Sequence, residues 1–167
     1  MILIINTASD LSVMEELKKS AKERGIDAEV VNAASLNINH CIGCNYCWLK
    51  TPGECSVKDD YEEILKKIIH ADEVWMVSDT ALGFINHSGK NIIDRLLPVA
   101  TMNLKFKDKQ MRHVHRYRKK TDFGLIITGE ADKEYLERWL SRVAVNLGSK
   151  SLGVFEKDEL KEASACM

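Results

Sequence analysis

The chain opens with Ile2-Leu3-Ile4-Ile5-Asn6 and continues with Thr7-Ala8-Ser9-Asp10-Leu11-Ser12. The first five residues are an apolar run that stops at polar side chains, which is typical of a strand buried on both faces of a parallel sheet. The next six are rich in residues that cap helices, and apolar side chains then recur at helical spacing as far as Gly25. A short apolar strand is predicted to follow at 27–32. A strand, a helix and a strand in this order predict a right-handed βαβ unit.

The same alternation continues along the rest of the chain. Further strands are predicted at 72–78, 123–128 and 151–155, and helices at 59–69, 90–100 and 132–147. Five apolar strands that alternate with four helices indicate an α/β fold with a doubly wound parallel sheet and helices on both faces. Five strands at this length suit the flavodoxin-like strand order 2-1-3-4-5. We expect residues 103–121, which are crowded with basic side chains, to form an irregular loop.

Length and composition narrow the class of protein. A chain of 167 residues with 45% hydrophobic and 29% charged residues is expected to form one soluble globular domain, residues 1–167. The formal net charge of −1 does not favour nucleic acid or an anionic membrane, and no apolar run approaches the ~20 residues of a membrane-spanning helix. Without a secretion signal, and with an odd number of cysteines, the chain is expected in a reducing cytoplasm.

Four of the five cysteines lie in one loop, at residues 39–58. Cys41, Cys44, Cys47 and Cys55 have the spacing C-x2-C-x2-C-x7-C. Four thiolates at close spacing can ligate a 4Fe–4S cluster or a zinc ion. A metal-free redox pair, for instance Cys47 with Cys55, and four free thiols in a structural turn are the other two interpretations. Cys166 is expected to be a free thiol near the end of the chain.

Ligands of open parallel sheets bind beyond the carboxyl ends of the strands. The loop after the first strand leads into a helix N-terminus, where free N–H groups can bind phosphate with help from Thr7, Ser9 and Ser12. The loop after the third strand is unusually apolar for a surface loop, which favours a ligand or a subunit contact. If a flavin binds there, its ring would meet a second set of residues: Thr80, Ala81, Leu82, Gly83 and Phe84. The alternatives are an ordinary capped helix and core or subunit contacts.

The basic segment 103–121 allows several interpretations. Its lysines and arginines could attract the phosphates of NAD(P)H. His113 and His115 have a same-face spacing that can bind a metal ion, but a solvated loop is the more frequent outcome for such a run. Nucleic acid is disfavoured because Tyr117 is the main aromatic residue among the charges.

The motifs together resemble the NADPH-dependent FMN reductase and iron–sulfur flavoprotein branch of the flavodoxin superfamily. The resemblance rests on the opening strand, on Cys-Ile-Gly-Cys-x-x-Cys-Trp-x-Lys-Thr-Pro-Gly-x-Cys followed by Asp59-Asp60, and on Gly89-Lys90 with Ile93-Asp94-Arg95. It implies a flavodoxin-like fold, FMN and NAD(P)H as cofactor and cosubstrate, and a homodimer or homotetramer. In family members of the iron–sulfur type, such cysteines hold a 4Fe–4S cluster beside FMN.

Two loops depart from the family pattern. The loop after the first strand lacks the glycine and arginine that relatives usually carry, and the loop after the third strand lacks their proline and tyrosine. One hypothesis is therefore an FMN-dependent NAD(P)H oxidoreductase or electron-transfer flavoprotein, with a cluster or redox thiols in the cysteine loop. The other is a non-catalytic binding or assembly module of the same fold that has lost FMN. No catalytic side chain can be assigned, because a flavin itself carries the redox chemistry.

Overall fold

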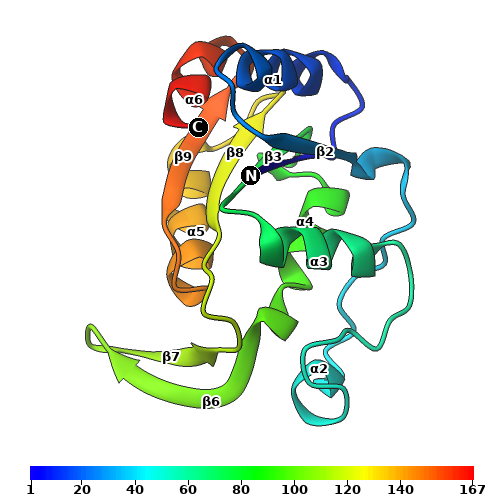
Figure 1. Cartoon of the computed structure of the whole chain (residues 1–167), viewed down its shortest axis with the longest axis vertical. Helices are drawn as coiled ribbons and strands as arrows, with labels where there is room; N and C mark the ends of the chain where they lie inside the picture. Colours follow the sequence, from blue (N-terminus) through cyan, green and yellow to red (C-terminus); the bar gives the residue numbers. More distant parts are fainter.

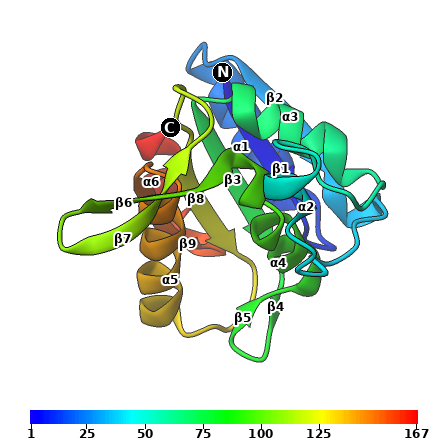
Figure 2. The same cartoon turned by 90° about the horizontal axis from the view of Figure 1, so that it is seen from below.

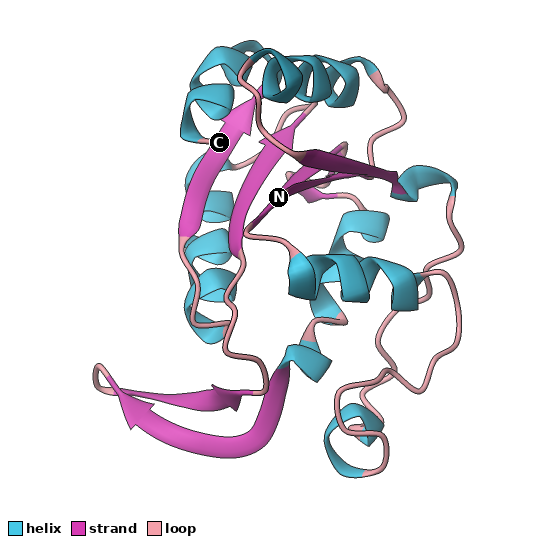
Figure 3. Ribbon diagram, in the orientation of Figure 1, coloured by secondary structure: helices cyan, strands magenta, loops and turns pink.

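The computed structural model describes all 167 residues, and its centre is a five-stranded parallel sheet (Figures 1 and 3). The strand order is β2-β1-β3-β8-β9, which is the predicted order 2-1-3-4-5 once only the strands of this sheet are counted. All five residues of β1 are buried, as the unbroken apolar run predicts. The strands are β1 (Ile2–Asn6), β2 (Ala28–Asn32), β3 (Glu73–Ser78), β8 (Asp122–Ile127) and β9 (Ser151–Glu156).

Helices cover both faces of the sheet. α1 (Ser12–Glu23) and α6 (Leu160–Cys166) lie on one face and pack on Ile2 and Ile4 of β1. On the other face, Leu3 and Ile5 pack with three helices: α3 (Tyr61–His70), α4 (His87–Asp94) and α5 (Lys133–Asn146). Alternate residues of one strand therefore serve two separate cores. No helix combines the length and the hydropathy that crossing a membrane requires.

A large aromatic side chain fixes the packing between β3 and β8. Trp75 is completely buried and lies opposite Gly124 in the strand register. A Cβ atom on Gly124 would stand 2.5 Å from the indole ring, so the ring occupies the space that any other residue would need. The glycine in this otherwise apolar strand is thus a requirement of side-chain packing.

The prediction of a helix at 90–100 is wrong at both ends. α4 begins earlier because the Asn86 side chain accepts a hydrogen bond from the Gly89 N–H and caps the helix. It ends at Asp94, and a short 3-10 helix, Leu97–Val99, follows with Pro98 inside it. Proline lacks the N–H that a continuing helix would need. Two further 3-10 turns span Ala33–Ser35 and Lys157–Glu159, and the cysteine loop contains the short helix α2 (Tyr46–Leu49).

Most of the predicted irregular loop at 103–121 is instead an antiparallel ribbon. β6 (Ala100–Lys107) and β7 (Gln110–His115) pair with each other and extend away from the body (Figures 1 and 2). Asp108 and Lys109 form the two-residue turn, and both have positive φ. Apolar residues alternate with basic ones along β6, but the density of positive charge obscured this strand pattern in the sequence.

Candidate functional site

The fold brings the four cysteines of the loop around a single cavity. Cys41, Cys44, Cys47 and Cys55 all line it, together with Arg95. Gly43 and Asn45 have left-handed backbone conformations, which turn the chain so that the first three thiols lie on one short segment. Gly53 (φ +94°) reverses the chain, and its N–H donates to the Cys47 carbonyl at 3.0 Å. The enclosed space is about 20 Å³, so the loop must widen to accept anything larger than a water-sized atom.

A buried cation stands beside these thiols. The Arg95 side chain is 1% exposed and pairs with the equally buried Asp59 at 2.6 Å. Its terminal nitrogens also donate to the carbonyls of Asn39 and Val57, at 3.0 Å each. The Arg95 Nε has no hydrogen-bond partner, although it is buried at the cysteine cavity. A buried, unpaired N–H next to thiols favours an anionic group in the cavity, such as thiolates or the sulfides of a cluster.

The thiols differ in their readiness to ionise. A hydrogen bond with the Ser56 hydroxyl lowers the pKa of Cys44, and the Cys44 Sγ lies 3.1 Å from that oxygen. Burial raises the pKa of Cys47, and the three neighbouring thiols add to this effect. A free Cys47 is therefore expected to stay protonated near neutral pH, whereas Cys44 is the more reactive thiol. All five cysteines, including the exposed Cys166, are free thiols in the structure.

The predicted phosphate loop lies where the topology places it, but several of its donors are already engaged. Thr7 is buried, and its hydroxyl donates to the Val77 carbonyl at 3.0 Å. The Ser9 N–H donates to Asp79 at 2.8 Å. The N–H and the hydroxyl of Ser12 donate to the Asp10 carboxylate at 2.9 and 2.8 Å.

Both carboxylates at this loop are held in the ionised form. A hydrogen bond from Lys157 is the main cause that lowers the pKa of Asp10, and the Lys157 Nζ lies 2.9 Å from it. Burial opposes the ionisation of Asp79, but hydrogen bonds from Ser9 and Thr128 outweigh it and lower its pKa. In this arrangement the loop carries two carboxylates, of which Asp10 is paired with Lys157, and the donors bound to them are not offered to a phosphate group.

The predicted ring-binding loop is a small hairpin, β4 (Thr80–Ala81) and β5 (Phe84–Ile85). The Leu82 side chain at its tip is fully exposed. Phe84, expected to cover a ring face, instead packs edge-on against Trp139 of α5, with ring centroids 4.9 Å apart. The Gly83 carbonyl accepts the Asp132 N–H at 3.1 Å, so the hairpin is closed onto the loop after β8.

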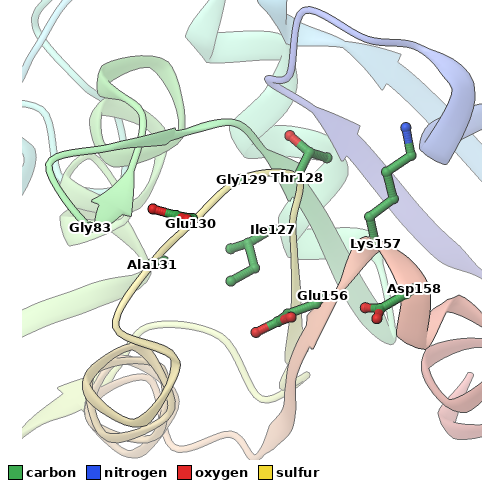
Figure 4. A pocket seen from close by; sticks show the side chains of 9 residues that line it. All are labelled: Gly83, Ile127, Thr128, Gly129, Glu130, Ala131, Glu156, Lys157 and Asp158. Carbon is green, nitrogen blue, oxygen red and sulfur yellow. The ribbon is translucent and has the colours of Figure 1, made fainter.

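An open cavity of about 880 Å³ adjoins this hairpin at the carboxyl ends of β8 and β9 (Figure 4). It is lined by Gly83 and by segments 127–131 and 156–158. Its charged side chains are three carboxylates and one lysine: Glu130, Glu156, Asp158 and Lys157. The cavity is therefore large enough for a cofactor, and its lining is mainly acidic.

Sequence reasoning assigned no role at the site to Arg95, Asp79 or Lys157. Arg95 was part of the motif that carried the family resemblance, but its contact with Asp59 spans 36 positions in the sequence. Lys157 reaches Asp10 across 147 positions. Such pairings depend on the tertiary fold, so no local sequence pattern predicts them. No three ligating side chains converge on one ion position, either at His113 and His115 or at the four cysteines.

One known protein family matches more than half of this chain. The sequence model described as NADPH-dependent FMN reductase matches residues 7–121, which include the whole cysteine loop. The chain belongs to this family. The resemblance inferred from the motifs is thereby confirmed.

Individual proteins similar to this chain include flavoproteins. An iron–sulfur flavoprotein of Methanocaldococcus jannaschii is 39% identical over 89 residues, which are 53% of this chain and 45% of that protein. The matched part is thus less than half of the relative's length. Among solved structures, the fold is similar to an FMN-dependent NADH-azoreductase of Bacillus anthracis in complex with FMN, with a TM-score of 0.61, 16% identity and coverage of 98% and 97% of the two chains.

A two-electron reduced flavodoxin of Megasphaera elsdenii aligns over the whole of both chains, with a TM-score of 0.53 and 13% identity. At such identities the likeness concerns the fold alone, and it confirms the flavodoxin-like architecture.

Proposed function

We propose that this chain is an FMN reductase-like oxidoreductase that carries a 4Fe–4S cluster in the Cys41–Cys55 loop. The observation that carries the proposal is the cavity lined by all four cysteines, with the buried Arg95 guanidinium beside them. Four thiolates are the ligand set of such a cluster, and a neighbouring cation favours their ionised form. No three of these thiols converge on a single ion position in this structure, so the loop would have to widen to bind either a cluster or a zinc ion.

The flavin part of the proposal rests on the family match. FMN, when bound, supplies the hydride and electron steps, so the chain would need to provide only binding and orientation. The acidic cavity of about 880 Å³ beside the β4–β5 hairpin is the space at the sheet edge that could receive a ring system. Phosphate binding at the helix would require Asp10 and Asp79 to release the donors of Ser12 and Ser9. NAD(P)H as electron donor is part of the same proposal.

The cluster is tested on chain purified without oxygen. We expect the absorbance of a 4Fe–4S cluster, with about four iron and four sulfide ions per chain. Replacing Cys44 by Ser should remove this absorbance, whereas Cys166→Ser, at an exposed position outside the cavity, should leave it unchanged. Iron-free protein, or absorbance that survives Cys44→Ser, would contradict the ligand assignment.

Flavin binding is tested separately, by titrating FMN and riboflavin and following the quenching of flavin fluorescence. An FMN reductase-like chain should bind FMN in a one-to-one ratio and accept electrons from NADPH or NADH. Protein that quenches neither flavin over the whole titration contradicts the flavin part and leaves the cluster part standing.

The second candidate function is a binding or assembly module that has the family's fold without its flavin. The engaged donors of the loop after β1 favour it, because Asp10 and Asp79 place carboxylates where a phosphate would have to bind. Under this alternative the purified chain takes up no flavin, and the cysteine loop binds iron or zinc, or nothing, without redox turnover. The two titrations and a metal analysis of the same sample separate the candidates.

A further inference from the structure

The ribbon of β6 and β7, residues 100–115, is here called the arm. A groove of about 380 Å³ lies at its base, where the arm meets α2, α4 and α5 (Figure 2). The groove shares no lining residue with the acidic cavity at the carboxyl ends of β8 and β9, and it shares only Leu97 with the cysteine cavity. It is therefore a third and separate space on the chain.

The lining of the groove has the character of a small-molecule site. Most of the residues that form it are hydrophobic or aromatic, and a few are polar or charged. Ligand sites in proteins combine these features and enclose ~300–1,000 Å³. At about 380 Å³ the groove is near the lower limit of that range, which suits a ligand of one or two rings better than a dinucleotide.

Three aromatic rings of the lining are held in place by the protein itself. The Trp48 indole donates to a backbone carbonyl at 2.8 Å, and its ring centroid is 4.7 Å from that of His113. The His113 Nδ1 donates to the Thr101 carbonyl at 2.8 Å. Trp139 of α5 is fixed by its edge-on contact with Phe84. Rings that are fixed before a ligand arrives lose little freedom on binding, and they favour a flat aromatic partner.

Arg112 adds a positive charge to this aromatic lining. Its side chain is 13% exposed, and its Nε is buried without a hydrogen-bond partner. Only its Nη2 is engaged, with Asp108 and Gln110 at 3.3 Å each. Asp108 is largely exposed, so water screens its attraction for the guanidinium. A buried N–H of a charged group is costly when it is unpaired, and a carboxylate oxygen is among its strongest acceptors.

The other charges around the groove do not oppose an anion. Asp94 also lines it, but the Lys90 ammonium binds the Asp94 carboxylate at 2.6 and 2.5 Å. The arm as a whole holds four lysine and arginine residues and one aspartate, which gives it a net charge of +3. Charge complementarity therefore favours a ligand with a negative group.

We propose that this groove binds a flat aromatic carboxylate of one or two rings. The ring system lies against Trp48, His113 and Trp139, and the carboxylate accepts the Arg112 Nε–H. One free charged donor matches a carboxylate, whereas a phosphate group needs several donors for its oxygens. Because the groove is separate from the cysteine cavity and from the acidic cavity, the proposal does not depend on a cluster or a flavin.

The test is calorimetric titration of the full chain with 2-naphthoate and with its neutral analogue, 2-naphthalenemethanol, up to about 2 mM. We expect wild type to bind 2-naphthoate in a one-to-one ratio, and at least about tenfold more tightly than the alcohol. Arg112→Gln should weaken the binding of 2-naphthoate by about tenfold or more. Lys105→Gln is the matched control, because it removes a positive charge opposite Arg112 in the strand register but outside the groove. It should bind like wild type.

A second variant tests the position of the site. Asn146 is exposed and lines the groove, so Asn146→Trp adds an indole to the groove without disturbing the core. We expect it to weaken both ligands, and circular dichroism should show all variants folded like wild type.

Three results would overturn the proposal. One is a wild-type chain that takes up no 2-naphthoate over the whole range. Another is a charge that has no effect, seen as equal affinity of wild type for the carboxylate and the alcohol, or as unchanged binding of 2-naphthoate by Arg112→Gln. The third is undiminished binding by Asn146→Trp, which would place the ligand outside the groove.

Discussion

Replacing Asp59 by Asn should strongly destabilise the chain, because its carboxylate is part of a buried ion pair at the cysteine loop. The Asp59 carboxylate is 1% exposed and accepts the Arg95 Nη1–H at 2.6 Å. It also accepts hydrogen bonds from the backbone and side chain of Asn39, at 2.8 and 3.0 Å, and from the Tyr61 N–H at 3.1 Å. One carboxylate thus joins the start of the cysteine loop, the first turn of α3 and the residue after α4.

The size of the effect follows from these contacts. Burial acts to raise the pKa of Asp59, but the hydrogen bonds from Arg95 and Asn39 outweigh it and lower the pKa from 3.8 to about 2. That difference is worth about 2.5 kcal/mol of folding free energy at neutral pH. Asparagine keeps the shape but leaves the Arg95 charge buried without a partner, which costs ~3–5 kcal/mol. We expect a loss in this upper range.

The assay is urea unfolding of wild type, Asp59→Asn and Asp60→Asn. Asp60 is the matched control because it is exposed and accepts one N–H, from Asn37 at 2.8 Å. Its amide replacement should cost less than about 1 kcal/mol. The pKa shift also fixes how stability depends on pH. The stabilisation of the folded state by Asp59 is complete above pH 3.8 and is lost as the pH falls through about 2. Equal stabilities of the two variants would refute the argument that the buried pair organises this region.

Three further predictions concern other parts of the chain. Gly124→Ala should lower the unfolding free energy by about 1–3 kcal/mol, because its Cβ would overlap the buried Trp75 ring; urea unfolding measures this. Trp48→Phe should cost about 1 kcal/mol in the same assay, since the Leu97 carbonyl loses its indole donor. Asp10→Asn should tighten FMN binding by about tenfold without changing riboflavin binding, because it removes a carboxylate from the predicted phosphate loop and leaves the positive charge of Lys157 unpaired there. Equal effects on both flavins in fluorescence titrations would contradict this.

The central sheet was predictable because its signal is local. Each buried strand appears in the sequence as an apolar run, and β1 is buried along its whole length as that pattern requires. The arm was missed because its alternation is carried by Leu104 and Phe106 between lysines, so the charge density suggested a solvated loop. The start of α4 was placed too late because its cap, Asn86, lies in the segment that was expected to be a loop, although asparagine is a favoured capping residue.

The sequence indicates which residues are candidates for the site but does not reveal the contacts they make. The spacing of the cysteines indicated a shared site, and the fold places all four around one cavity. The loop after β1 was expected to offer hydroxyl and N–H donors, and it has them. Sequence could not reveal that Asp79, 70 positions away from Ser9, would take one of these donors. Long-range pairings of polar groups are set by tertiary packing, for which a single sequence carries no periodic signal.

The cysteine loop is held in place by several contacts that do not involve its thiols. Arg95 and Asp59 hold its start through Asn39, the Trp48 indole ties its helix to Leu97, and the Gly53 N–H closes its turn on Cys47. None of these bonds uses a thiol. Small metal-binding domains whose only organising contacts are their ligands unfold when the metal leaves. Here a buried ion pair and a closed backbone turn hold the loop, so we expect it to keep its place beside α4 when the four thiols carry no cluster.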